Sequence, residues 1–387
     1  MTLSTNWSFP TAIRIGAGCI EELGATCDEH GIERPLIVTD PGMFELEAFA
    51  AVQSSLPKDT AVFCDIKPNP VGANVDAGVD VFRSGGHDGV VAVGGGSALD
   101  CGKVIALQAG QTRPMWDFED IGDNWKRADA DAIAPIIAVP TTAGTGSEVG
   151  RAGVVIDEDS KRKVIIFHPA MLPVAVLCDP ELTVGLPRNL TVGTGMDALS
   201  HSLEALCAPA YHPTAHGIGL EGCRLVLEHL PRVVADPENI GSRTQMMAAA
   251  AMGAVAFQKG LGGMHALAHP IGAMFDTHHG MTNAVLMPYV LAANRSAVDD
   301  PISRLAGYTG VAGGFDGFLE HVLRLRSDLG VPYCLADLGV DASFVAEIAA
   351  AAAVDPSASG NPIPFTEEVA AGVFVNACSG ELDEAVG

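Results

Sequence analysis

Four of the twelve histidines in this sequence lie in one segment, GGMHALAHPIGAMFDTHHGMTNAV, at positions 262–285. His265 and His269 are four residues apart, so a helix would present both on one face, and Pro270 would bend or end that helix. His279 follows a little later. Imidazole nitrogens gathered in this way suit divalent transition metals. The segment therefore predicts a metal site, and the alternative is that these are ordinary core or surface histidines.

A second segment, GMDALSHSLEAL, offers the anionic ligand that such a site would need. Asp197 and His201 are again four residues apart and would share one face of a helix. One carboxylate and three imidazoles form a borderline ligand set for Fe²⁺ or Zn²⁺, closed by protein on one side and open to a substrate oxygen on the other. Both segments are rich in small residues that let helices pack closely, which favours the site, but spacing alone leaves open that these are ordinary core or surface residues.

Two glycine-rich loops indicate a dinucleotide site. In VVAVGGGSALDCGK a hydrophobic strand leads into three glycines, a serine and a helix, where bare backbone and helix N-terminal N–H groups can hold a pyrophosphate. The alternative is a tight turn between strand and helix. PTTAGTGSE, at 140–148, follows a second apolar strand and offers hydroxyl groups to a diphosphate or a ribose. We expect the two loops to converge on one nucleotide.

An acidic residue, Asp40, ends the apolar run PLIVTD. A carboxylate at the end of such a strand accepts hydrogen bonds from an adenosine ribose and repels a 2′-phosphate, which favours NAD over NADP without excluding NADP. In the common Rossmann pattern this acid lies about 20 residues after the glycine loop. Here it precedes the loop by about 54 residues. The sequence therefore predicts a variant, Rossmann-like order of strands.

Composition narrows the class of protein. The chain has 387 residues, 48% of them hydrophobic, and a formal net charge of −25, which disfavours nucleic acid and anionic membranes as partners. Nine scattered cysteines without a CxxC pair indicate reduced thiols in a cytoplasm. The N-terminus lacks the features of a signal peptide. The apolar run MMAAAAMGAVAF, at 246–257, is shorter than the roughly 20 residues that cross a bilayer. We expect a cytoplasmic enzyme without membrane partners.

The two halves of the chain have different patterns. Up to about residue 185, short β-branched runs alternate with helical stretches, which indicates a largely parallel sheet with helices on both faces. After about residue 186, alanine- and leucine-rich segments with helical spacing take over. We therefore predict an α/β dinucleotide-binding domain over 1–185 and an all-helical metal-binding domain over 186–387, joined through DPELTVGLPRN at 179–189.

Over nearly its whole length the chain resembles the iron-containing (group III) alcohol dehydrogenases. The motifs that carry the resemblance are GGGSALDCGK, PTTAGTGSEV, CDPELT, GMDALSHSLEA and HALAHPIGAMFDTHHGMTNAVLMPYV. It implies an N-terminal dinucleotide-binding domain, an all-helical C-terminal domain, an active site in the cleft between them and, commonly, a homodimer. This architecture is shared with the dehydroquinate-synthase-like enzymes.

The resemblance also implies roles for individual residues. Fe²⁺, or alternatively Zn²⁺, would be held by Asp197, His201, His265 and His279, and His269 would lie beside the substrate as the catalytic proton donor. NAD would be bound by Asp40, Gly95, Gly96, Ser97, Asp100, Thr141, Thr142 and Leu182, with Lys163 near the cofactor. The reaction expected is hydride transfer between nicotinamide C4 and a primary alcohol or aldehyde.

Departures from the commoner family pattern concern the substrate. Ala152 and Gly153 stand where many relatives have bulkier residues, which suggests a roomier pocket. Lys259, with Arg151, is a candidate to bind an aldehyde that carries a distal anion, and the alternative is that Lys259 faces solvent or pairs with a local acid. Two other enzyme classes are considered: an iron-free reductase of the maleylacetate reductase kind, and a dehydroquinate-synthase-like metal-dependent lyase. The complete set of four ligand positions argues against the iron-free reductase. The lyases use a different ligand set and substrate-binding basic residues, which GMDALSHSLEA does not resemble.

Overall fold

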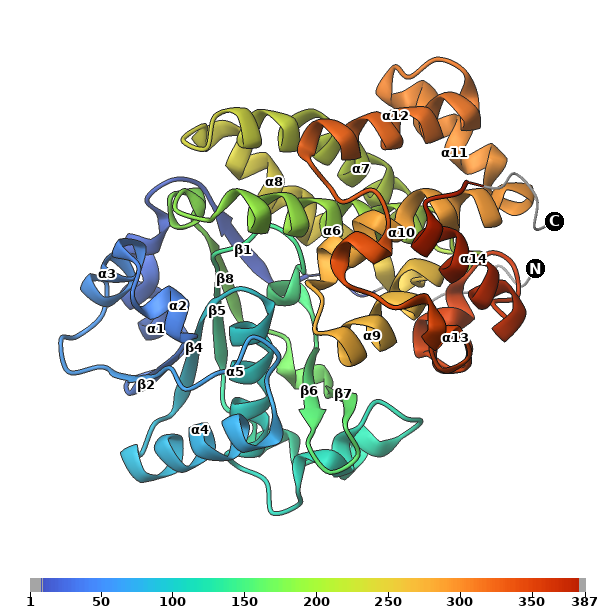
Figure 1. The fold of residues 1–387 in the computed structure, drawn as a ribbon. Helices are drawn as coiled ribbons and strands as arrows, with labels where there is room; N and C mark the ends of the chain where they lie inside the picture. Colours follow the sequence, from blue (N-terminus) through green and yellow to red (C-terminus); the bar gives the residue numbers. More distant parts are fainter. Residues whose placement is uncertain (1–7, 9, 383–387) are drawn as a thin grey trace. The chain divides into compact units, whose positions relative to one another are not determined.

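The computed structural model describes residue 8 and residues 10–382. These residues form two compact units, one comprising 10–186 and 237–251 and the other comprising 8, 187–236 and 252–382. The first unit contains the sheet, and the second is helical (Figure 1). The class of fold predicted from the sequence, a parallel-sheet domain followed by a helical domain, is confirmed.

Among the described residues, six parallel strands form one sheet in the order β1-β8-β5-β4-β2-β3. In that order the strands are β1 (Ala12–Ile15), β8 (Ala175–Cys178), β5 (Ile136–Pro140), β4 (Gly89–Gly94), β2 (Pro35–Val38) and β3 (Ala61–Phe63). A separate antiparallel hairpin joins β6 (Ala152–Asp157) to β7 (Arg162–Phe167). The variant strand order expected from the position of Asp40 is confirmed, because β2, which precedes Asp40, comes before the glycine-loop strand β4 in the chain and the observed order differs from the common 3-2-1-4-5-6.

Helices cover both faces of this sheet. They are α1 (Leu23–Glu29), α2 (Pro41–Phe44), α3 (Glu47–Ser54), α4 (Gly72–Gly85) and α5 (Gly96–Gln108). The same unit contains the short 3-10 helices η1 (Cys19–Glu22), η2 (Met115–Phe118), η3 (Asn124–Arg127), η4 (Ala130–Ala132), η5 (Ser147–Val149), η6 (Pro169–Met171) and η7 (Pro180–Thr183). Successive side chains of a strand point to opposite faces. Val38 thus packs in the core with α4 and α5, and Ile37 packs in the other core with α1 and α3. Two buried faces explain why these strands read as continuous apolar runs.

The helical unit is built from α6 (Arg188–Cys207), α7 (Pro213–Ala235), α9 (Gly263–Phe275), α10 (His279–Ala293), α11 (Arg295–Thr309), α12 (Gly314–Leu329), α13 (Val345–Ala353) and α14 (Glu367–Ser379), together with the 3-10 helices η8 (Phe257–Lys259), η9 (Leu335–Leu338), η10 (Ala342–Phe344) and η11 (Pro356–Gly360). Helix α8 (Ile240–Ala256) begins in the segment that clusters with the sheet unit, where Arg243 donates to the backbone oxygen of Val184. Pro270 does not end its helix, since α9 continues to Phe275.

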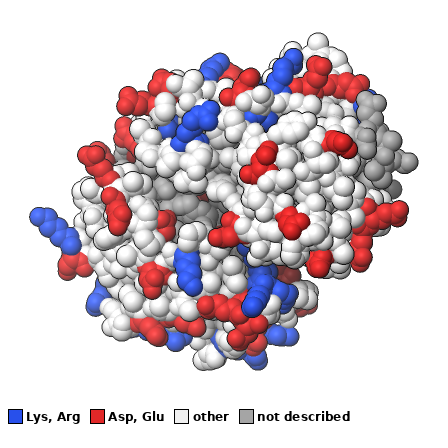
Figure 2. Space-filling model, in the orientation of Figure 1, with Lys and Arg blue, Asp and Glu red and all other residues white. Residues whose placement is uncertain are grey.

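The surface matches the acidic composition. Figure 2 shows acidic side chains spread over the visible face, with fewer basic ones between them. Such a surface gives polyanions no continuous basic patch on this face. Within the described part of the chain, no helix combines the length and apolar character that spanning a membrane requires.

Candidate active site

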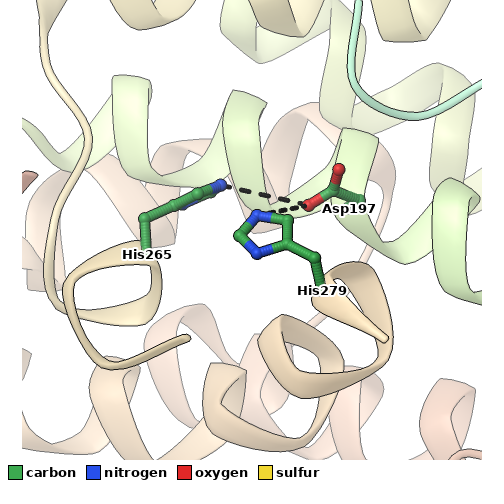
Figure 3. A group of neighbouring side chains, drawn as sticks. All are labelled: Asp197, His265 and His279. Carbon is green, nitrogen blue, oxygen red and sulfur yellow. Dashed lines mark ion pairs between the residues drawn. The ribbon is translucent and has the colours of Figure 1, made fainter. Parts of the chain in front are cut away.

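Three helices bring Asp197, His265 and His279 together (Figure 3). Asp197 lies on α6, His265 on α9 and His279 at the first position of α10, and the possible ligand atoms of the three lie within 4.8 Å of one another. The Asp197 Oδ1 atom is 3.9 Å from His265 Nε2 and 3.7 Å from His279 Nε2. Residues separated by up to 82 positions in the chain therefore form one cluster.

His201 borders this cluster, one helical turn after Asp197 on α6. Its Nε2 is 4.0 Å from Asp197 Oδ1, and its ring stacks on that of His265 with 4.8 Å between centroids. Phe257 of η8 also packs against the His201 ring. The Nδ1 atom of His201 is buried and has no hydrogen-bond partner among the described residues. Such an atom is costly to bury without a partner, but the nitrogen of His201 that faces Asp197 is Nε2.

The close approach of α6 and α10 depends on glycine. A Cβ atom at Gly280 would stand 2.2 Å from the backbone oxygen of Gly193 and 2.9 Å from the Cβ of Asp197. No larger residue fits there without moving a helix. Helix α10 begins after His278, whose Nδ1 accepts the N–H of Met281, a local N-cap. The glycine contact and this cap together place His279 opposite Asp197.

Glu204, on the same helix as Asp197 and His201, contacts the nitrogen of His265 that faces away from Asp197. His265 Nδ1 lies 2.7 Å from Glu204 Oε2, and both residues are buried. Burial lowers the pKa of His265 well below its ordinary value, so the ring is neutral. Burial also raises the pKa of Glu204 to about 7, although backbone N–H groups of α9 favour its charged form.

Asn283, one turn after His279 on α10, is fully buried at the centre of the cluster. Its Nδ2 donates to Asp197 Oδ1 over 3.0 Å and lies 3.1 Å from His279 Nε2 and 3.3 Å from His265 Nε2. Burial by itself opposes ionisation of Asp197, but the surrounding imidazoles, His201 foremost, and this amide hold its pKa below the ordinary value. The cluster thus offers an ionised carboxylate beside imidazole nitrogens, a donor set that fits a divalent transition metal.

His269 lies one turn after His265 on α9 and is only partly buried. Its ring stacks on that of His279, with centroids 5.5 Å apart. Its Nδ1 is 2.8 Å from Oδ2 of Asp355, which precedes η11. Burial opposes the charge on Asp355, but the hydrogen bond from His269 holds the pKa of Asp355 below its ordinary value. The pair therefore places a carboxylate-oriented imidazole next to the metal-type cluster.

In the sheet unit, neighbouring strands bring the nucleotide-type loops together. Asp40 follows β2 and caps α2 by accepting the Met43 N–H, and a Cβ at Gly94, the last residue of β4, would stand 3.1 Å from its Oδ2. Gly94 has a φ of +142°, a conformation that side chains disfavour. The acid that the sequence places 54 residues before the glycine loop is thus adjacent to it, because β2 and β4 pair.

The second loop reaches the same place from β5. The Thr141 N–H donates to Gly94 O over 3.0 Å, and a Cβ at Gly95 would lie 3.2 Å from Thr142 Cγ2. Gly96 begins α5 in close contact with Thr145. The two loops therefore lie side by side, with a glycine backbone and threonine residues at the carboxyl ends of β4 and β5. This is the end of a parallel sheet at which nucleotides bind, and their binding of one nucleotide stays a prediction.

The remaining candidate cofactor residues lie around these loops. Ser97 donates to the backbone oxygen of Pro68. Asp100 accepts from Ser147 Oγ over 2.5 Å and from the Val154 N–H over 3.0 Å, so it ties α5 to the second loop and to β6. Lys163 lies on β7 opposite Ile156, and Leu182 is buried in η7.

The two candidate substrate residues have local partners. Lys259 Nζ donates to the backbone oxygen of Leu206 over 3.0 Å, near the C-terminus of α6, and burial lowers its pKa. The guanidinium carbon of Arg151 lies 5.7 Å from the centroid of the Phe167 ring. Both contacts are of kinds that stabilise a fold. The binding of substrate by Lys259 and Arg151 stays a prediction.

Sequence reasoning did not single out Glu204, Asn283 or Asp355. Glu204 lies within the motif GMDALSHSLEAL, three residues after His201, and Asn283 lies four residues after His279, so helical spacing could have found both. Asp355 gives no such signal, because it reaches His269 through a contact between residues 86 positions apart.

Comparison with known proteins now gives the family. A family model described as "Iron-containing alcohol dehydrogenase" matches residues 10–180. A second model, described as "Fe-containing alcohol dehydrogenase family, C-terminal", matches residues 191–377. The 4-hydroxybutyrate dehydrogenase of Cupriavidus necator is 39% identical over 363 residues, 91% of this chain and 94% of its own. The NAD-dependent methanol dehydrogenase of Bacillus methanolicus is 32% identical over 384 residues, 96% of this chain and 100% of its own.

Solved structures agree. A 1,3-propanediol oxidoreductase superposes with a TM-score of 0.92 at 33% identity, over 97% of this chain and 100% of its own. The chain therefore belongs to the iron-containing alcohol dehydrogenase family. It is an oxidoreductase that acts on alcohols, as the sequence predicts.

Proposed function

We propose that this chain interconverts primary alcohols and aldehydes with NAD(H), using a divalent metal held by Asp197, His201, His265 and His279. The observation that carries the proposal is the convergence of three of these ligand groups within 4.8 Å, with His201 stacked on one of them. Fe²⁺ is the metal proposed first because of the family, and Zn²⁺ accepts the same donors. When bound, the cation polarises the substrate oxygen and the nicotinamide supplies or accepts hydride.

The residues of the chain supply positioning and proton transfer. In aldehyde reduction, we assign His269 to deliver a proton to the substrate oxygen as charge develops on it. An imidazole suits this role because its ordinary pKa is near neutrality. Asp355 keeps the His269 ring oriented through Nδ1, which leaves Nε2 for the transfer. The reaction then balances as aldehyde, NADH and a proton giving alcohol and NAD⁺.

For the cofactor, we propose that Asp40 binds the adenosine ribose and that the loop of Gly95 and Gly96 holds the pyrophosphate at the start of α5. The placement of Asp40 beside Gly94 supports both assignments. Thr141 and Thr142 would contribute from the second loop. Ser97, Asp100, Lys163 and Leu182 complete the proposed set. NAD is favoured over NADP because a carboxylate there repels a 2′-phosphate.

For the substrate, we propose a primary alcohol or aldehyde with a distal anionic group. The hydroxy-acid named for the Cupriavidus necator relative supports this choice. Arg151 and Lys259 are the proposed partners of the anion. A lysine ammonium has three N–H donors, and the Leu206 carbonyl takes one of those of Lys259. We further propose a cytoplasmic homodimer.

The test is NADH oxidation against paired aldehydes of equal chain length, one ending in a carboxylate and one in a methyl group, each repeated with NADPH. We expect turnover with NADH and a higher kcat/KM for the carboxylated member. Equal kcat/KM values for the two members would contradict the proposed anionic substrate but not the proposed dehydrogenase activity. No oxidation of NADH or NADPH with any aldehyde, by protein shown to contain metal, would contradict the proposed function.

A further inference from the structure

Glu204 lies on the face of α6 that carries both candidate ligands of that helix. It follows Asp197 by seven residues and His201 by three, which is two turns and about one turn of a helix. Glu204 is buried, with 5% of the residue exposed, and its side chain reaches the start of α9. One helix thus contributes two candidate ligands and a third side chain that contacts His265, a candidate ligand of another helix.

Three N–H donors converge on the Glu204 carboxylate. Oε2 accepts from the Gly262 N–H over 2.9 Å and lies 2.7 Å from His265 Nδ1, and Oε1 accepts from the Met264 N–H over 2.7 Å. The two backbone bonds fix the position of the carboxylate, because they anchor it to the N-terminal N–H groups of α9. The third bond then fixes the imidazole.

The Asn283 amide lies on the other side of the imidazole. Asn283 Nδ2 must be the donor to the Asp197 carboxylate, which sets the orientation of the amide. The same amide nitrogen lies 3.3 Å from His265 Nε2. That amide has two N–H groups for three nearby acceptors, so it does not assign the tautomer by itself. The Glu204 carboxylate does, because at 2.7 Å it accepts a proton from Nδ1 and so leaves the lone pair on Nε2. The ring presents its lone pair toward Asp197.

We propose that Glu204 is a positioning residue that sets the metal affinity of the site by fixing the tautomer and rotation of His265. This inference rests on the proposed metal site and goes beyond it, since Glu204 is not itself among the proposed ligands. A carboxylate that accepts the second N–H of a ligating histidine commonly changes metal affinity by about 10–100-fold. Replacement by glutamine keeps the shape but leaves one acceptor oxygen for three donors.

A purely structural role must be separated from this one, because Glu204 also caps α9. Asn361 provides the matched control. Its Oδ1 accepts the Gly263 N–H over 3.0 Å, so it caps the same helix at the adjacent residue, and it also pairs with Asn294. Its loss weakens the helix start without removing the acceptor of His265 Nδ1.

The experiment measures Zn²⁺ dissociation constants of metal-free full-length protein by competition with a chromogenic chelator. The variants are E204Q, N361A and D197A. We expect E204Q to bind Zn²⁺ about 10–100-fold more weakly than wild type and N361A to stay within about threefold, although both lower the melting temperature. Wild-type affinity in E204Q, or equal weakening in E204Q and N361A, would overturn the proposal. Wild-type affinity in D197A would instead overturn the metal site itself.

A second measurement does not depend on the folding of a variant. Selective ¹⁵N labelling of the histidines in wild-type, metal-free protein reports the tautomer of each ring through its nitrogen shifts, with the His265 signals assigned by their absence in H265Q. We expect His265 to be protonated at Nδ1 and bare at Nε2. A His265 ring protonated at Nε2 would contradict the role given to Glu204.

Discussion

His269 of α9 and Asp355 form a hydrogen bond of 2.8 Å between Nδ1 and Oδ2 across 86 positions of the chain. Because the Asp355 side chain is 12% exposed and that of His269 is 31% exposed, the carboxylate anchors the ring from the protein side. Because Nδ1–H is donated to Asp355, the ring gives a proton to substrate from Nε2 when it is doubly protonated, and the carboxylate stabilises that cation. This pair is therefore the place to test the proton-transfer assignment.

We expect H269A to lower kcat by about 10²-fold, the usual scale of a lost general acid. D355N should lower kcat by about tenfold, because the ring keeps its position less often. Both should retain metal, as neither residue is a proposed ligand. Steady-state kinetics at saturating NADH, with metal content determined on the same samples, checks this. Unchanged kcat in H269A would remove His269 from the reaction.

Asp40 should control the choice of cofactor. Replacement of Asp40 by serine removes the charge that would oppose a 2′-phosphate, while the serine hydroxyl can still cap α2. We expect the ratio of kcat/KM for NADPH to that for NADH to rise by at least about tenfold, or about 1.4 kcal/mol. A ratio equal to that of wild type would place the adenosine ribose elsewhere.

Glu148 gives the sheet unit a pH-dependent stability. It is 3% exposed, and burial raises its pKa to about 7, with its own backbone N–H and Lys103 opposing the shift. The folded protein therefore holds the proton more tightly than the unfolded chain does. Stability from this group is present below the ordinary pKa of about 4.5 and falls as pH rises through about 7, by up to about 3 kcal/mol.

Urea unfolding of wild type and E148Q at pH 5 and pH 8 tests this effect. The other titrating groups are the same in both proteins, so the difference between their unfolding free energies isolates Glu148. We expect the unfolding free energy of wild type, relative to that of E148Q, to be lower at pH 8 than at pH 5. A difference that does not change between the two pH values would show that Glu148 is ionised in the folded protein throughout this range.

Lys259 distinguishes a substrate role from a structural one. K259M removes the bond to the Leu206 carbonyl and the favourable charge near the C-terminus of α6, which should lower the unfolding free energy by about 0.5–1 kcal/mol. If Lys259 also binds the distal anion, KM should rise for the carboxylated aldehyde and stay constant for its methyl-ended partner. A loss of stability with both KM values unchanged would leave Lys259 as a helix cap only.

Much of the sheet could be predicted from the sequence because its central strands are buried on both faces. The runs around β2, β4, β5 and β8 are continuous and apolar, so they stand out from the helical segments. Strand β1, AIRI, did not stand out, because it is short, lies at the sheet edge and includes Arg14. Strand β7, RKVIIF, pairs only with β6 in a hairpin and begins with two basic residues.

Part of the candidate site could also be predicted from the sequence, and part could not. Helical spacing of four residues identified Asp197 with His201 and His265 with His269, because a period of 3.6 residues brings such pairs to one face. The supporting acids depend on tertiary contacts. Helical spacing places Glu204 one turn after His201, but its partner His265 lies on another helix, and Asp355 comes from a segment near the C-terminus. The two contacts themselves are therefore not encoded in a local pattern.

The measurement that tests the central claim most directly is the metal content of anaerobically purified protein, wild type against D197A, by elemental analysis with NADH oxidation followed on the same samples. We expect about one Fe or Zn per wild-type chain, and loss of both metal and turnover in D197A, with the fold retained by circular dichroism. Metal-free wild-type protein that reduces aldehydes at full rate, or D197A with undiminished metal and turnover, would contradict it.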